Sequence, residues 1–303
     1  MPVATIFHNP GAGDEQHSKK KLLTILEENG FECRYSSTKD KKWEKQPIDP
    51  LSDCIIIAGG DGTVRKVIGM LLRQPVLDSL LPIGIITLGT ANNISKTLGI
   101  EKDPETVVKS WKESRLQRFD IGRIFNVPAE EFFIESFGYG LFPYLMMEMK
   151  KKKKEVEKLN PDEKLLFTLK LLRDILDKYE PRECNLIIDG KDHSGSYILA
   201  EVMNAKSIGP NLELAADNDP ADGVFEVVVI RGDEKEKFSA YLQQRINGED
   251  LPYTYHTIRG KDISISWQGT HIHVDDAIVK LEEGETVEIK MRPGLLNFMT
   301  GNS

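Results

Sequence analysis

Residues 54–63 change abruptly from an apolar run, Cys-Ile-Ile-Ile-Ala, to a glycine-rich turn, Gly-Gly-Asp-Gly-Thr. An unbroken β-branched run of this kind predicts a strand buried on both faces, as in a parallel sheet covered by helices. Thr63 can cap a helix that continues to about Arg73. A strand, a tight turn and a helix in this order indicate a βαβ crossover, which restricts the chain to a small set of α/β folds.

The same pattern recurs over the first 122 residues. Apolar runs at 3–7, 31–35 and 83–88 alternate with amphipathic segments, the first of which ends at Asn29–Gly30. Strands separated by helices predict an α/β N-terminal domain with a parallel sheet, covering residues 1–122.

The pattern changes beyond residue 122. Residues 142–180 have helical spacing, and from 183 onward short alternating runs are separated by turn dipeptides such as Asp189–Gly190. We therefore expect a second, mainly antiparallel β-sandwich domain at 123–303, with a helical insertion near 142–180.

Composition excludes several classes of protein. Apolar residues make up 40% and charged residues 29%, which argues against disorder, and a net charge of −8 argues against a nucleic-acid partner. The three cysteines lie far apart, which predicts a reducing compartment. With no signal-like N-terminus and no apolar run of about 18 residues, we expect a cytoplasmic protein, with contact at a membrane surface left open.

The glycine turn itself indicates a ligand. Glycines 59, 60 and 62 let the backbone come close to a bound group, and the first N–H groups of the following helix favour phosphate. Asp61 would repel phosphate unless a divalent cation lay between them. A tight turn without a ligand is the alternative, but three glycines around an aspartate favour a binding site.

Two further glycine-rich loops follow strands of the same predicted sheet. They are Asn9-Pro10-Gly11-Ala12-Gly13 and Leu88-Gly89-Thr90-Ala91-Asn92-Asn93. Neither is a Walker A loop or a GxGxxG fingerprint. Three such loops at the carboxyl edge of one parallel sheet indicate a nucleotide crevice.

These loops together resemble the diacylglycerol kinase catalytic-domain family of the NAD kinase/diacylglycerol kinase superfamily, and especially its soluble bacterial lipid kinases. Phe119–Gly122, Asn204 and Ala221–Val228 resemble later motifs of that family, in the same order. The Gly-Gly-Asp-Gly-Thr turn alone is less specific, because NAD kinases and phosphofructokinases carry close relatives of it.

The resemblance implies ATP-dependent phosphorylation of a lipid hydroxyl, with Mg²⁺ held through an aspartate–water network at Asp61. A kinase of another hydroxyl substrate, such as NAD, is the alternative enzyme. By match to the family, the nucleotide would lie on Asn9, Pro10, Gly11, Ala12, Gly13, Thr38, Gly59, Gly60, Asp61, Gly62, Thr63, Thr90 and Asn92.

The resemblance also implies a structural cation in the second domain. Its ligands would be the Asp222 carboxylate and the carbonyls of Asp219 and Val224. The spacing is not that of an EF-hand, and a solvated acidic turn explains the pattern equally well.

The family's catalytic base lies in an Asp-Gly-Glu triplet, which here reads Asp275-Asp276-Ala277. The resemblance makes Asp275 the base, but the altered triplet leaves open a nucleotide- or lipid-binding protein without turnover. If this segment is extended, the two carboxylates point to opposite faces. We expect His271 and His273 to be packed or exposed side chains and not metal ligands.

Five consecutive lysines, Lys150–Lys154, precede a leucine stripe at Leu165, Leu169, Leu172 and Leu176. This pattern favours a helix covering the second sheet. The alternative is that the lysines contact anionic headgroups while the helix borders a lipid cleft. The sequence leaves a homodimer open.

Overall fold

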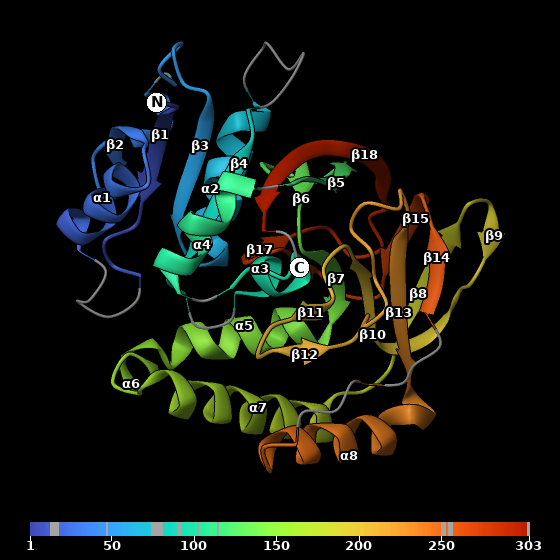
Figure 1. Ribbon diagram of the computed structural model, residues 1–303. Helices are drawn as coiled ribbons and strands as arrows, with labels where there is room; N and C mark the ends of the chain where they lie inside the picture. The colour runs from blue at the N-terminus through green and yellow to red at the C-terminus, as the bar shows by residue number, and fades with distance from the viewer. Residues whose placement is uncertain are drawn as a thin grey trace. The chain divides into compact units, whose positions relative to one another are not determined.

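Figure 1 shows the computed structural model, which describes residues 1–12, 18–46, 48–73, 81–89, 92–101, 103–113, 115–249, 253 and 257–301. The chain forms two compact units. The first comprises Met1–Asp120 and the segment from Pro293 onward, and the second comprises Ile121–Arg292.

The first unit contains the predicted parallel sheet. Its strands lie in the order β4-β3-β1-β2, each parallel to its neighbour. All six residues of the central strand β3 are buried, which agrees with the unbroken apolar run. The strands are β1 (Val3–His8), β2 (Glu32–Ser37), β3 (Cys54–Gly59) and β4 (Ile83–Thr87).

Helices cover this sheet. Apolar side chains of α1 (Lys19–Glu28) and α4 (Pro104–Ser110) share one core cluster with Ile6 and Ile56. Ile55 and Ile57 alternate with Ile56 and so point to the opposite face, and α2 (Asp61–Leu72) also contacts β3. The remaining elements are the short helix α3 (Asn93–Thr97) and two 3₁₀ turns, Trp43–Lys45 and Trp111–Glu113.

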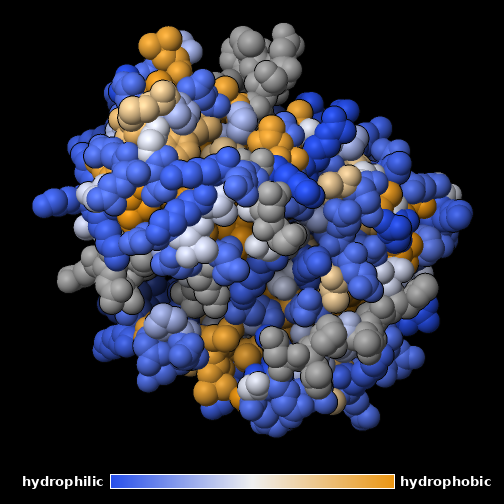
Figure 2. Space-filling model, viewed as in Figure 1, coloured by the Kyte–Doolittle hydropathy of each residue, from blue (hydrophilic) through white to orange (hydrophobic). Residues whose placement is uncertain are grey.

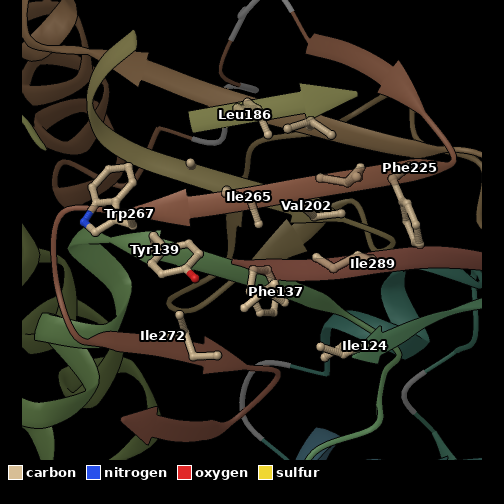
Figure 3. Packing of buried hydrophobic residues seen from close by; sticks show 14 of the residues in the cluster. Ile124, Phe137, Tyr139, Leu186, Val202, Phe225, Ile265, Trp267, Ile272 and Ile289 are labelled. Carbon is tan, nitrogen blue, oxygen red and sulfur yellow. The ribbon is translucent and has the colours of Figure 1, made fainter. Parts of the chain in front are cut away.

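The second unit is the predicted antiparallel sandwich with helices. In its core the rings of Tyr139 and Trp267 stack, with centroids 5.6 Å apart (Figure 3). Its strands are β5 (Arg115–Phe125, which begins in the first unit), β6 (Phe132–Phe133), β7 (Ser136–Gly140), β8 (Arg182–Ile188), β9 (Lys191–Asp192), β10 (Gly195–Met203), β11 (Ser207–Ile208), β12 (Leu212–Glu213), β13 (Phe225–Arg231), β14 (Thr257–Gly260), β15 (Asp262–Trp267), β16 (His271–Val274), β17 (Ala277–Lys280) and β18 (Val287–Thr300, which ends in the first unit).

The helices of this unit pack on a second apolar cluster that also includes Ile198, Leu199 and Met203 of β10. A register shift between Tyr197 and Leu199 turns two successive residues, Ile198 and Leu199, towards this cluster. The helices are α5 (Leu141–Lys151), α6 (Lys153–Val156), α7 (Pro161–Lys178), α8 (Lys235–Ile246) and the 3₁₀ turn Gly232–Glu234. The insertion near 142–180 corresponds to α5–α7, whereas the sequence analysis missed α8.

The end of the chain departs from the predicted domain division. We expected residues 123–303 to form one domain, but the segment from Pro293 belongs to the first unit. There Phe298 pairs with Ile83 of β4 and packs edge-to-face on Phe119, with ring centroids 5.3 Å apart. β18 continues through this point, but its buried alternation is interrupted from Arg292 to Leu295, and the turn dipeptide Pro293–Gly294 was the available sequence signal for a boundary.

Candidate functional site

An open hollow with a volume of about 440 Å³ lies at the carboxyl ends of the strands in the first unit. Carboxyl ends of parallel strands meet at one edge of a sheet, so loops distant in sequence come together there. Seven of the predicted nucleotide-binding residues line this hollow, together with three others. The lining residues are Asn9, Gly11, Ala12, Thr38, Lys39, Trp43, Gly60, Gly62, Thr63 and Lys66.

Asn9 joins two of the loops. Its Nδ2 donates a hydrogen bond to Thr63 Oγ1 over 3.2 Å, and its Oδ1 accepts one from the Gly11 N–H over 3.0 Å. Thr63 was expected to cap helix α2, but the helix begins at Asp61 with Gly60 as its N-cap. Thr63 therefore lies in the first turn, where its hydroxyl fixes Asn9.

The glycines at this edge are required by close contacts. A Cβ on Gly60 would lie 3.0 Å from the Cα of Gly89, and one on Gly59 would lie 2.5 Å from the Cβ of Thr63. The loops after β3 and β4 therefore touch through bare backbone. Of these glycines, Gly60 also lines the hollow, so its backbone can come close to a ligand.

Asp61 links the same two loops through its side chain. Its oxygens accept the N–H groups of Asn93, over 3.0 Å, and of Ile94, over 3.3 Å, at the start of α3. Burial raises the pKa of the Asp61 carboxyl, against the lowering effect of these hydrogen bonds. Asp61 thus lies beside the hollow and does not line it.

The other predicted residues of these loops lie nearby. Asn92 has a φ of 51° and exchanges hydrogen bonds with the backbone of Gly89, over 3.1 and 2.8 Å. Pro10 is exposed in the turn after β1. Gly13 and Thr90 lie outside the described residues.

Sequence reasoning missed Lys39, Trp43 and Lys66 as lining residues. Lys39 Nζ lies against Gly11, where a Cβ would be only 2.9 Å from it. Lys66 follows Thr63 by three positions and so shares its helix face, a spacing that could have revealed it. The two lysines bring positive charge to a hollow edged by backbone and hydroxyl groups.

In the second unit, Asp275 occupies the hairpin turn between β16 and β17, which Val274 and Ala277 close. Its φ is 50°, so the expectation of an extended segment is wrong. The carboxylate accepts the N–H groups of Ile134, Glu135 and Ser136 over 2.8–3.2 Å. Asp275 is 9% exposed whereas Asp276 is exposed, so the two carboxylates do differ in environment.

His273 is buried and paired, while His271 is partly exposed. His273 Nε2 lies 2.8 Å from Oε2 of Glu201, which the sequence analysis did not single out. A glutamate inside the apolar run Tyr-Ile-Leu-Ala-Glu-Val-Met was the available signal, because a buried carboxyl requires a partner.

The acidic loop after residue 216 contains the three residues predicted to bind a cation. Asp222 forms an ion pair with Arg259, and its Oδ1 accepts the Val224 N–H over 3.1 Å. Asp219 Oδ1 accepts the Ala221 N–H over 3.0 Å. In the part of the chain that the structure describes, no three His, Cys, Asp or Glu side chains form a metal-binding group. The cation at Asp222 stays a prediction, and Arg259 is its competitor.

Chelation distinguishes a cation from Arg259 at this loop. If a cation binds the folded loop, EDTA should lower the melting temperature by roughly 2–4 °C, the shift expected for about 1 kcal/mol in a unit of this size. Asp222→Ala should remove that sensitivity, and Arg259→Met should increase it. A wild-type melt that EDTA leaves unchanged would identify Arg259 as the counter-ion of Asp222.

Of the five lysines, Lys150 and Lys151 end α5, Lys152 lies between the helices, and Lys153 and Lys154 begin α6. Two of them pair with glutamates, Lys151 with Glu148 over 2.6 Å and Lys153 with Glu157 over 3.6 Å. Figure 2 shows an apolar patch among hydrophilic side chains over α5 and α7. Tyr144 of α5 and Leu166 of α7 are exposed. Among the residues described, no helix is long and apolar enough to cross a membrane.

Comparison with known proteins assigns both parts of the chain to families. Residues 3–124 match the diacylglycerol kinase catalytic domain, and residues 151–300 match the YegS C-terminal NAD kinase beta sandwich-like domain. The chain belongs to the diacylglycerol kinase catalytic-domain family. The suspected resemblance is thereby confirmed.

Curated relatives and solved structures agree with this family. The chain is 27% identical to a diacylglycerol kinase of Bacillus subtilis, over 83% of this chain and 81% of that one. It is 24% identical to a diacylglycerol kinase of Staphylococcus saprophyticus, over 87% and 84% of the two chains. A crystal structure of a diacylglycerol kinase from Bacillus anthracis shares the fold, with a TM-score of 0.74, 20% identity and coverage of 99% and 97%.

Proposed function

We propose that this family member is an ATP-dependent kinase that phosphorylates the hydroxyl group of a lipid. The observation that carries the proposal is the hollow in the first unit, where residues that follow β1, β2 and β3 come together; seven of them are nucleotide-binding residues by match to the family. The curated relatives named diacylglycerol kinase support a lipid as acceptor.

The hollow fits the polyphosphate of a nucleotide. Lys39 and Lys66 supply positive charge, and the backbone of Gly60 and Gly62 begins helix α2, whose N-terminus favours anions. Mg²⁺, when bound, would neutralise phosphate oxygens, and we assign Asp61, beside the hollow, to hold it through water. Asn9 and Thr63, whose side chains are fixed by their mutual hydrogen bond, would help to orient the phosphates.

Phosphoryl transfer also requires loss of the hydroxyl proton of the lipid. We assign its acceptance to Asp275, the aspartate retained from the family's triplet. Its orientation is fixed by the backbone N–H groups that it accepts, so a substrate would meet it already in place. Most of the catalysis in such a kinase comes from positioning and charge neutralisation.

A substrate screen tests this function. Purified protein is incubated with γ-labelled ATP and a panel of lipid alcohols in vesicles, prepared with and without an anionic lipid, and with NAD in solution. We expect label in a lipid, with faster transfer on anionic vesicles if the lysines of α5 and α6 contact the membrane surface. If only NAD became labelled, the substrate would be NAD and not a lipid. Nucleotide binding without any transfer would indicate a non-catalytic protein.

Removing either lysine of the hollow should weaken nucleotide binding. Lys39→Ala and Lys66→Ala should each raise the Kd for ATP by about tenfold or more, because hydrogen bonds to charged groups contribute roughly 1.5–3 kcal/mol. Equilibrium dialysis with labelled ATP measures this. Lys109→Ala is the matched control, since Lys109 lies on α4 and pairs there with Glu105. An unchanged Kd in both hollow variants would place the phosphates elsewhere.

A further inference from the structure

A buried hydrogen-bonded pair spans three neighbouring strands of the second unit. Glu201 on β10 and His273 on β16 are 0% and 1% exposed, and both are in register with Gly138 of the intervening strand β7. A Cβ on Gly138 would lie 2.2 Å from the Glu201 carboxyl atoms. The glycine therefore leaves the space through which the glutamate reaches the imidazole across a whole strand.

The contact of His273 Nδ1 shows how many protons the pair carries. Nδ1 lies 3.0 Å from the backbone oxygen of Asp275, which can only accept, so Nδ1 carries a hydrogen. One further proton is then shared between Nε2 and Glu201. The groups facing the pair are the Phe142 ring on α5, Gly138 on β7 and the turn at Asp275.

The turn that His273 contacts lacks the residue that such a turn usually needs. Two-residue hairpins with a right-handed twist favour Asp-Gly or Asn-Gly, since the second residue also adopts a positive φ. Asp189–Gly190 follows this rule, with φ values of 47° and 76°. In Asp275–Asp276 only the first residue has a positive φ.

The two turns are otherwise alike, which makes the difference informative. Asp189 Oδ1 accepts the N–H groups of Lys261, over 3.1 Å, and Asp262, over 2.9 Å, as Asp275 Oδ1 accepts those of Glu135 and Ser136. The Asp275 turn has two further contacts: the Ile134 N–H also donates to the Asp275 carboxylate, and His273 donates to the Asp275 carbonyl.

We propose that His273 is a positioning residue that stabilises the left-handed conformation of Asp275, a role that a glycine at the second position of the turn would otherwise make unnecessary. Glu201, which reaches His273 across Gly138, orients the imidazole for this contact. The pair acts as a latch on the turn. The importance of the latch for catalysis rests on the proposed function, but the latch itself does not. It can therefore be tested without any activity measurement.

The latch should depend on its shared proton. Burial opposes the charged imidazole, but the Glu201 carboxylate and the Asp275 carbonyl outweigh it, so the pKa of His273 lies above its usual value of 6.5. Burial also raises the pKa of the Glu201 carboxyl. Because the folded pair keeps its proton longer than the unfolded chain does, its contribution is complete below pH 6.5 and is lost as the pH rises through the folded pKa.

Amide hydrogen exchange, followed by NMR, tests the latch. The amides of Glu135 and Ser136 report on the Asp275 turn, and those of Lys261 and Asp262 report on the Asp189 turn as an internal reference. The variant combines His273→Phe with Glu201→Leu, so that no carboxyl is left buried without a partner. We expect the protection of Glu135 and Ser136 to fall about tenfold relative to the reference amides, the scale of one lost hydrogen bond.

Two further variants separate a latch from ordinary core packing. Adding Asp276→Gly to the double variant should restore most of the lost protection, because an Asp-Gly pair can adopt the standard hairpin turn, with a positive φ at both residues, without the contact from His273. Glu201→Gln should keep the protection but abolish its decline above pH 6.5, since an amide donates to Nε2 without titrating. Equal loss of protection at both turns, or no rescue by Asp276→Gly, would overturn the proposal. Either result would leave the kinase proposal standing.

Discussion

Asp61→Asn should reduce lipid phosphorylation by about 10²-fold or more while the melting temperature changes by no more than about 2 °C. The substitution removes one negative charge beside the hollow, and loss of such a charge at a metal–phosphate site costs several kcal/mol of transition-state stabilisation. It keeps an acceptor oxygen for the Asn93 and Ile94 N–H groups, and asparagine caps a helix as well as aspartate does. The measurement is kcat with saturating lipid, together with a thermal melt.

Asp103→Asn is the control for this experiment. Asp103 also accepts a backbone N–H at a helix start, that of Thr106 over 2.8 Å, but it lies before α4. We expect full activity from this variant. A similar loss in both variants would assign the effect of Asp61 to helix capping, and near wild-type activity of Asp61→Asn would remove the nucleotide site from this edge of the sheet.

The parts of the fold that the sequence predicted are those with local causes. The apolar run at 54–58 predicts a buried parallel strand, because few other secondary structures accommodate a short, continuous β-branched segment. The glycine loops could then be placed at one edge, since the carboxyl ends of parallel strands must meet there. Seven of the predicted residues line the hollow for this reason.

What the sequence could not predict depends on long-range contacts. Glu201 and His273 lie 72 positions apart, and only the pairing of both strands with Gly138 brings them together. Lys39 enters the hollow because its long side chain folds back on Gly11, which residue spacing does not reveal. Phe298 rejoins the first unit through a pairing with Ile83 that nothing near it in the sequence specifies.

Asp275→Asn and Asp276→Asn should have unequal effects, although the two residues are neighbours of the same type. Asp275 is our candidate for the proton acceptor, so its carboxamide should lower kcat/KM by at least the roughly 10²-fold typical of a general base. Asp276 is exposed, so its substitution should lower kcat/KM much less. ATP binding should survive both changes, because the nucleotide hollow belongs to the first unit.

The same carboxylate also anchors the turn, so activity alone would not separate the two roles of Asp275. Asparagine keeps one acceptor oxygen but places an amide NH₂ among the N–H donors of Ile134, Glu135 and Ser136. If Asp275 is the base, activity falls far more than melting temperature or amide protection does at this turn. If it serves only as an anchor, all three fall together, and Asp276→Gly, which eases the turn, restores activity to Asp275→Asn. Equal and small effects of both Asp→Asn changes would place the proton acceptor on another residue, because a base cannot be replaced by a group that takes up no proton.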